Sequence, residues 1–107
     1  MEIYMRSNRG KYDAQGAYND GKVIVYKGSR INVYYSENFK RHASAEAYRK
    51  DPSCVDKNGN VLKDCVFTSL SAAAQFVCGW SVNGRVTWKV DKKTDMRHWL
   101  VREANKE

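Results

Sequence analysis

The sequence predicts an α+β fold, in which a small, mainly antiparallel sheet packs on a central Ala-rich helix and a C-terminal helix docks outside. Three observations lead to this prediction. Residues 23–26 form a β-branched run, which is the strongest strand signal in the chain. Residues 69–79 place apolar side chains at helical spacing around three consecutive alanines. The 107 residues contain one proline and no linker or internal repeat, which predicts a single domain over residues 1–107.

The first third of the chain predicts a series of strands. A short apolar run at residues 3–5 is typical of an edge strand, and the small and aromatic residues of 12–18 predict a second strand. Asn19-Asp20-Gly21 supplies turn residues before residues 23–26, so these two segments are expected to pair as a hairpin. The alternation over residues 31–35 predicts a further strand.

The middle of the chain predicts a helix followed by weaker β signals. Residues 36–50 suit a short helix with mixed polar faces. The helix should end by Asp51, because the residue before Pro52 is pushed out of the helical region. A turn at residues 57–60 and an apolar run at 65–67 predict a second hairpin, or a loop with strand ends.

The apolar helix should form the buried centre of the domain. Thr68 or Ser69 can cap it by accepting from free backbone N–H groups, and Gly79 is a natural C-terminal stop. Beyond it, Asn83-Gly84 predicts a tight hairpin or loop turn rather than a ligand contact. The alternation over residues 86–90, which includes Trp88, predicts a strand with Trp88 in the core.

A terminal helix is expected over residues 94–107. Thr94 or Asp95 is placed to cap it. Because so short a helix has little intrinsic stability, it should dock through Trp99 and Leu100 or fray.

The charge of the chain favours polyanionic partners. Nineteen Lys and Arg residues face twelve Asp and Glu residues, which gives a net charge of +7 and a basic protein. The excess is larger in residues 1–50 than in the remainder, and it is not gathered in a tail. The sequence has neither an apolar run long enough to span a membrane nor a secretory signal, so we expect a cytoplasmic protein.

Metal, cofactor and catalytic sites are not predicted. The three cysteines are 11 and 13 residues apart, and they are expected to be reduced thiols, with Cys65 and Cys78 buried and Cys54 exposed in a loop. Neither His42 nor His98 lies near a cysteine pair in sequence, as a zinc site would require. A small hydrolase or nuclease would need one of these histidines to meet a carboxylate in the fold.

Two blocks of residues resemble a known bacterial family. The more specific block is Phe67-Thr68-Ser69-Leu70-Ser71-Ala72-Ala73-Ala74, followed by Val77, Gly79, Asn83-Gly84 and Trp88-Lys89. The other consists of Ala14-x-Gly16 and Val25-Tyr26-Lys27-Gly28-Ser29. Together they resemble the domain-of-unknown-function family numbered 4357 over about residues 13–90. The chain departs from the family pattern at Leu70, where the family has Pro, and over residues 44–63.

The resemblance implies an accessory domain that faces nucleic acid. Members of the family are often found at the C-terminus of GIY-YIG nucleases and beside restriction or methylation enzymes, and the pattern is similar to the module associated with restriction enzymes and adenine methylases. It implies no known catalytic activity. A nuclease or methylase on a separate chain is therefore a possible partner, in a bacterial or phage setting.

Basic residues beside two glycine-containing turns are the predicted binding site. If the two turns lie at one end of the sheet, they form a basic patch for DNA with Tyr34 or Trp80 nearby. Trp80 could instead cover the edge of the core. The candidate nucleic-acid-binding residues are Lys27, Gly28, Ser29, Arg30, Trp80, Asn83, Gly84, Arg85 and Lys89. The alternative function is a protein-interaction or self-association module, because seven Tyr and three Trp residues are typical of interaction hot spots.

Overall fold

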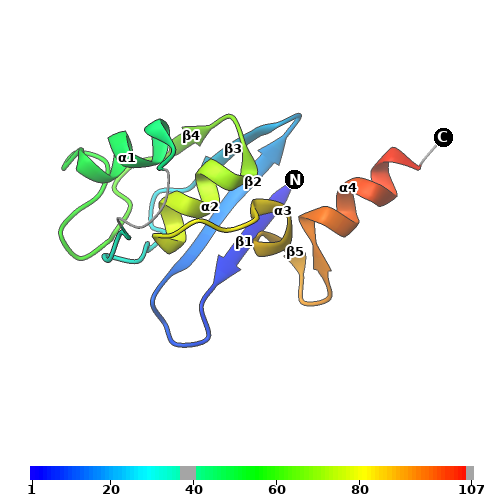
Figure 1. The fold of residues 1–107 in the computed structure, drawn as a ribbon, viewed down its shortest axis with the longest axis horizontal. Helices are drawn as coiled ribbons and strands as arrows, with labels where there is room; N and C mark the ends of the chain where they lie inside the picture. Colours follow the sequence, from blue (N-terminus) through cyan, green and yellow to red (C-terminus); the bar gives the residue numbers. More distant parts are fainter. Residues whose placement is uncertain (37–40, 106–107) are drawn as a thin grey trace.

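The computed structural model, which describes residues 1–36 and 41–105, is an α+β fold built on a six-stranded antiparallel sheet in the order β4-β3-β2-β1-β5-β6 (Figure 1). The strands are β1 (Glu2–Arg6), β2 (Asp13–Asn19), β3 (Lys22–Val25), β4 (Cys65–Phe67), β5 (Lys89–Asp91) and β6 (Thr94–Asp95). The helices are α1 (Ala43–Lys50), α2 (Leu70–Cys78), α3 (Gly84–Thr87) and α4 (Met96–Ala104). In Figure 1, α2 lies across the sheet with α1 beside it, and α4 projects at the other end.

The predicted hairpin is confirmed. β2 and β3 pair with Asn19 opposite Lys22, and the turn between them is Asp20-Gly21. β1, however, is not an edge strand, because it pairs with β2 on one side and with β5 on the other. Its side chains alternate as a period of two requires, so that Ile3 and Met5 are buried in the core.

Helix α2 is buried on nearly every side, as its apolar sequence predicts. Ser69 caps it by accepting from the Ala72 N–H at 3.0 Å, and Gly79 ends it in the left-handed conformation with φ of 90°. The ring of Phe76 packs against that of Phe67 on β4, with 5.1 Å between centroids. The predicted caps of this helix are therefore confirmed.

Residues 31–35 do not form the predicted strand. Instead they cross the C-terminal end of α2, where Asn32 donates from its backbone N to the Val77 carbonyl at 2.8 Å and from Nδ2 to the Cys78 carbonyl at 3.0 Å. The last carbonyls of a helix have no partner within the helix, so a buried helix end needs donors from elsewhere. The strand predicted from the alternating pattern is therefore wrong, because this segment forms hydrogen bonds with a helix end and not with a neighbouring strand.

Helix α1 begins later than the sequence indicates. The structure places its first residue at Ala43 and its last at Lys50, with Asp51 outside the helix as predicted. Residues 37–40 of the predicted helix lie outside the described residues, while Ser36 is buried and not helical.

The predictions of a tight turn at Asn83-Gly84 and of a strand over residues 86–90 are partly wrong. Asn83 caps the short helix α3, its Oδ1 accepting from the Arg85 N–H at 3.0 Å, and the strand begins only at Lys89. Trp88 is fully buried as expected, and its Nε1 donates to the Leu70 carbonyl at 3.1 Å.

The terminal helix begins where the sequence places it. Asp95 provides the cap, because its Oδ1 accepts from the His98 N–H at 2.9 Å. Trp99 packs edge-to-face on Tyr18 of β2, with 6.1 Å between ring centroids, and Leu100 is half-buried beside the core. The expected docking through these two residues is confirmed.

All three cysteines are buried, which corrects the exposed thiol expected for Cys54. Its side chain is 1% exposed, because the polar loop after α1 folds back through a bridge between Val55 and Val61. Among the described residues, no group of three or more His, Cys, Asp or Glu side chains could hold a metal ion. In the same part of the chain, no helix is long and apolar enough to cross a membrane.

Candidate nucleic-acid interface

The turn after β3 is held by hydrogen bonds from its own backbone. Gly28 adopts φ of 92°, and its N–H donates to the Val61 carbonyl at 2.9 Å. The Lys27 N–H donates to Asp64 Oδ1 at 2.8 Å, and the Ser29 N–H donates to the carbonyl of Tyr26 at 3.1 Å. These three N–H groups are therefore committed within the protein and do not form an anion-binding nest.

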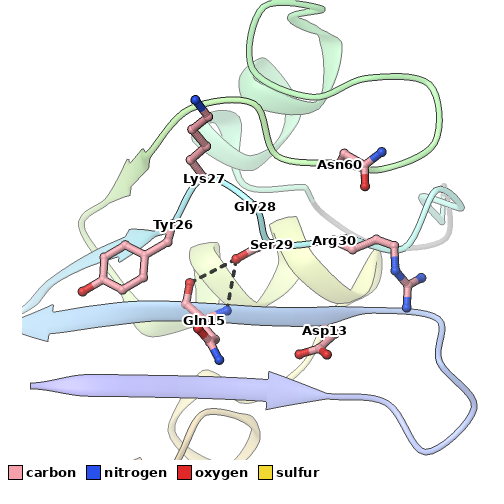
Figure 2. A pocket seen from close by; sticks show the side chains of 8 residues that line it. All are labelled: Asp13, Gln15, Tyr26, Lys27, Gly28, Ser29, Arg30 and Asn60. Atoms are coloured by element: carbon pink, nitrogen blue, oxygen red, sulfur yellow. Dashed lines mark hydrogen bonds between the residues drawn. The ribbon is translucent and has the colours of Figure 1, made fainter.

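A first hollow of about 490 Å³ opens beside this turn (Figure 2). Ser29 forms part of its floor, and its Oγ both accepts from the Gln15 N–H and donates to the Gln15 carbonyl, at 3.1 Å each. Ser29 thus fastens the turn to β2. The residues lining the hollow are Asp13, Gln15, Tyr26, Lys27, Gly28, Ser29, Arg30 and Asn60.

Arg30 lies at the centre of the site. Its backbone is fixed, since it exchanges two hydrogen bonds of 2.9 Å with Asp13 and forms a bridge with Asn60. Its guanidinium forms no ion pair within the described part of the chain, and the Asp13 carboxylate is bound by Arg6 at 3.0 Å. Arg30 lines the first hollow and also a second one.

The second hollow has a volume of about 530 Å³ and a largely apolar wall. Val33 and Tyr34 are 66% and 62% exposed, which is unusual for large apolar side chains. Trp80 is half-buried and packs edge-to-face on Tyr12, with 6.4 Å between ring centroids. The lining residues are Lys11, Arg30, Ile31, Asn32, Val33, Tyr34, Asn58 and Trp80. Trp80 therefore packs against the core and also faces this hollow.

A loop that the sequence analysis did not connect with the site contributes to both hollows. Asp56 Oδ1 accepts from the backbone N–H groups of Asn58 and Asn60 at 2.9 Å, and its Oδ2 accepts from Asn60 Nδ2 at 2.9 Å. These bonds, above all the one from the Asn60 side chain, lower the pKa of Asp56. The polar turn at 57–60 is visible in the sequence, but its position next to Arg30 is not.

The second group of predicted site residues lies elsewhere. Arg85 lines another hollow together with Gly21, which precedes β3, whereas Gly28 follows β3. Gly84 is buried, and Asn83 caps α3. The two turns therefore lie toward opposite ends of β3, and the single patch expected from them does not form.

Lys89 is also separate from the two hollows. It lies opposite Tyr4 in the pairing of β5 with β1, and its Nζ donates to the Val86 carbonyl at 3.1 Å. One of its N–H groups is therefore engaged within the protein.

Among the described residues, the cations around the two hollows form no ion pair, and the same holds for cations elsewhere such as Lys22, Lys63 and Lys92, whereas some others are paired. Lys50 bonds Glu46 at 2.7 Å, and Arg97 lies 3.9 Å from Asp95. By contrast, the side chains of Lys11, Lys27 and Arg30 form neither an ion pair nor a hydrogen bond within residues 1–36 and 41–105. Arg85 is likewise unpaired there, but it is the only basic residue of its hollow.

One histidine does meet a carboxylate. His98 Nδ1 lies 2.9 Å from Asp95 Oδ1, and the same oxygen accepts from the His98 N–H. This backbone bond is the main cause that lowers the pKa of Asp95. The contact follows from the capping of α4, in which residues three apart are neighbours. His42 is exposed, and its backbone N–H donates to Gln75 Oε1 at 2.8 Å.

The comparison with known families covers nearly the whole fold. A family model described as a domain of unknown function, DUF4357, matches residues 3–100, from β1 into α4. The match is longer than the span of residues 13–90 expected from the sequence blocks. No curated protein and no solved structure matches the chain significantly.

Proposed function

The chain belongs to the DUF4357 family of unknown function, and we propose that it is a non-catalytic module that binds nucleic acid, in particular DNA. The observation that carries the proposal is the convergence of three free cations, Lys11, Lys27 and Arg30, on two hollows that share Arg30. Phosphate contacts from free Lys and Arg dominate affinity for nucleic acid. The surplus of positive charge over the whole chain supports the same class of partner.

The resemblance supplies a setting for such a module. We propose that it acts in the cytoplasm of a bacterium, or in a phage-infected one, and that it brings a nuclease or a modification enzyme on another chain to DNA. The proposal assigns binding to the surface around Arg30, made of the two hollows, and it assigns no chemistry to this chain.

Salt titration with paired variants tests the proposal. Labelled single-stranded and duplex DNA would be titrated with protein between about 50 and 300 mM salt, where each neutralised phosphate contributes a log–log slope of roughly −0.7 or −0.9, respectively. The double variant Lys27→Glu/Arg30→Glu should lose at least about tenfold in affinity and flatten this slope. The control Lys22→Glu/Arg85→Glu changes the net charge equally at the other end of β3, and it should bind nearly as the parent does.

Two results would contradict the proposal. Absence of binding to either DNA at about 50 mM salt would remove nucleic acid as the partner. Equal losses for the two double variants would show that only bulk charge matters and that the surface around Arg30 is not the site.

A second candidate function rests on the edge of the sheet. β4 is an outer strand of the sheet, and its Val66 side chain is 43% exposed. The Val66 backbone N–H donates to the Tyr48 hydroxyl at 3.1 Å, so another chain would be bound through the exposed apolar side chain and not through strand pairing at this residue. A protein-interaction or self-association module would show a mass that rises with concentration in analytical ultracentrifugation, and Val66→Lys would abolish the rise.

A further inference from the structure

We infer that the second hollow, between Tyr34 and Trp80, receives an unpaired base of a single DNA strand while Arg30 holds the adjoining phosphate. This inference rests on the proposed function and names the form of nucleic acid that the site takes. It begins from two neighbouring side chains, Val33 and Tyr34, which are 66% and 62% exposed on a segment with a well-fixed backbone.

The backbone that presents Tyr34 is anchored on both sides. Asn32 is 6% exposed, and its Oδ1 accepts from the Tyr34 N–H at 3.1 Å while its Nδ2 donates to the Cys78 carbonyl at 3.0 Å. Further along, the Ser36 N–H donates to the Gly79 carbonyl at 2.9 Å. The apolar side chains are therefore displayed from a preorganised segment, which lowers the entropy lost when a ligand binds.

The walls of the hollow suit a flat aromatic ligand. Tyr34, Trp80 and Val33 are among its lining residues, and the volume of about 530 Å³ is within the range of small-molecule sites. Trp80 packs edge-to-face on Tyr12, and this contact restricts the motion of its ring. Stacking on aromatic side chains is the usual way in which proteins hold single-stranded bases.

The polar rim complements a nucleotide and not merely an apolar group. Arg30 lies between the apolar hollow and the hollow beside Lys27, and Lys11 borders the apolar hollow as well. The Asn58 side-chain amide also lines this hollow, and it makes no hydrogen bond within the described residues, so it can meet a base edge. In a single strand, phosphates and bases alternate, so that cations can bind the phosphates while neighbouring aromatic side chains stack on the bases.

A single strand fits this arrangement better than a duplex does. In a duplex both faces of each base are covered by stacking, and a concave aromatic hollow can be filled only by a base that leaves the stack, at a cost of a few kcal/mol. An unpaired strand pays no such cost.

The test compares two DNA forms and two exposed positions by fluorescence anisotropy. The probes are a labelled deoxythymidine strand of about 12 nucleotides and a labelled hairpin duplex with the same number of phosphates, at about 50 mM salt. We expect the parent protein to bind the strand at least tenfold more tightly than the hairpin, and Tyr34→Ala to weaken binding of the strand by roughly tenfold. Tyr34→Phe retains the ring and should bind as the parent does.

Val101→Ala is the matched control, because Val101 is 56% exposed on α4, outside both hollows. Circular dichroism melting would confirm that each variant is folded. Equal binding of strand and hairpin, together with an unchanged Tyr34→Ala variant, would overturn the inference and leave the proposed function standing. Failure of the parent to bind either probe would overturn both. Equal losses in Tyr34→Ala and Val101→Ala would also overturn the inference, since the effect would not belong to the hollow.

Discussion

Gly28 and Gly84 look alike in the sequence but have opposite surroundings in the structure. Each lies in a short polar turn sequence with a basic residue close by. Gly28 is exposed with φ of 92°, and a Cβ atom added to it would meet nothing within 4 Å. Gly84 is buried at the start of α3, and a Cβ atom there would overlap the Leu70 carbonyl and the Ser71 nitrogen. Glycine is therefore favoured at position 28 by the left-handed backbone conformation, and at position 84 by the close approach of the α2 backbone.

The difference explains why only one of the two predicted turns reaches the candidate interface. The turn at Gly28 is open to solvent, so Lys27 and Arg30 on either side can face a ligand. The chain at Gly84 is pressed against α2, and the Gly84 N–H donates to Ser71 Oγ at 3.2 Å. A glycine in a polar sequence therefore indicates a special backbone position without saying whether that position faces solvent or protein.

The largest expected effect is the loss of folding stability on replacing Gly84, which should exceed the loss on replacing Gly28. Gly84→Ala should lower the free energy of unfolding by about 3 kcal/mol, because backbone atoms of α2 must move to admit the methyl group. Urea denaturation followed by circular dichroism measures the change. A loss below that of Gly28→Ala would contradict the assignment of Gly84 to close packing.

A smaller loss is expected for Gly28→Ala. Open space surrounds the position, so only the left-handed conformation opposes the methyl group, at about 1 kcal/mol. The same denaturation experiment applies. Gly28→Asn should lose less than Gly28→Ala, since Asn tolerates this conformation better; equal losses for the two would point to a steric cause.

The smallest effect is local and depends on pH. The folded state lowers the pKa of Asp56, so the stabilisation from this carboxylate is present above its unfolded pKa and is lost as the pH falls through its folded pKa. Protection of the Asn60 amide, relative to its intrinsic exchange rate, should therefore be constant above about pH 4 and should decline as the pH falls further below that value.

The Gly84 amide is the internal control for the pH experiment. Its acceptor is the Ser71 hydroxyl, which does not titrate in this range, so its protection should stay constant. Parallel loss at Asn60 and Gly84 would indicate global unfolding and not the opening of the loop at Asp56.

Much of the fold follows from local sequence signals. The β2–β3 hairpin, the Ser69 cap and Gly79 end of α2, and the Asp95 cap of α4 are all as predicted. In each of these cases the determining contacts lie within a few residues along the chain, where turn and capping chemistry apply.

The predictions that failed depend on distant contacts. Residues 31–35 alternate like a strand but bond to the end of α2, more than 40 residues away. Cys54 lies in a polar stretch but is covered when the loop folds back on itself. Of the candidate interface, Lys27, Arg30 and Trp80 were identified from the sequence, whereas Lys11 and Asn58 were not, because neither has a local pattern that marks a site.

The sequence alone determined the fold class, the family, the positive charge and the residues that end the main helices, because these depend on composition and on local backbone chemistry. Only the tertiary structure decided that Lys11 and Lys27 border the hollows lined by Arg30 and that Arg85 lies apart from them. The reason is physical. The two glycine-containing turns carry similar local signals, and their surroundings are fixed by the packing of α2 against α3 and by the bonding of residues 31–35 to the end of α2.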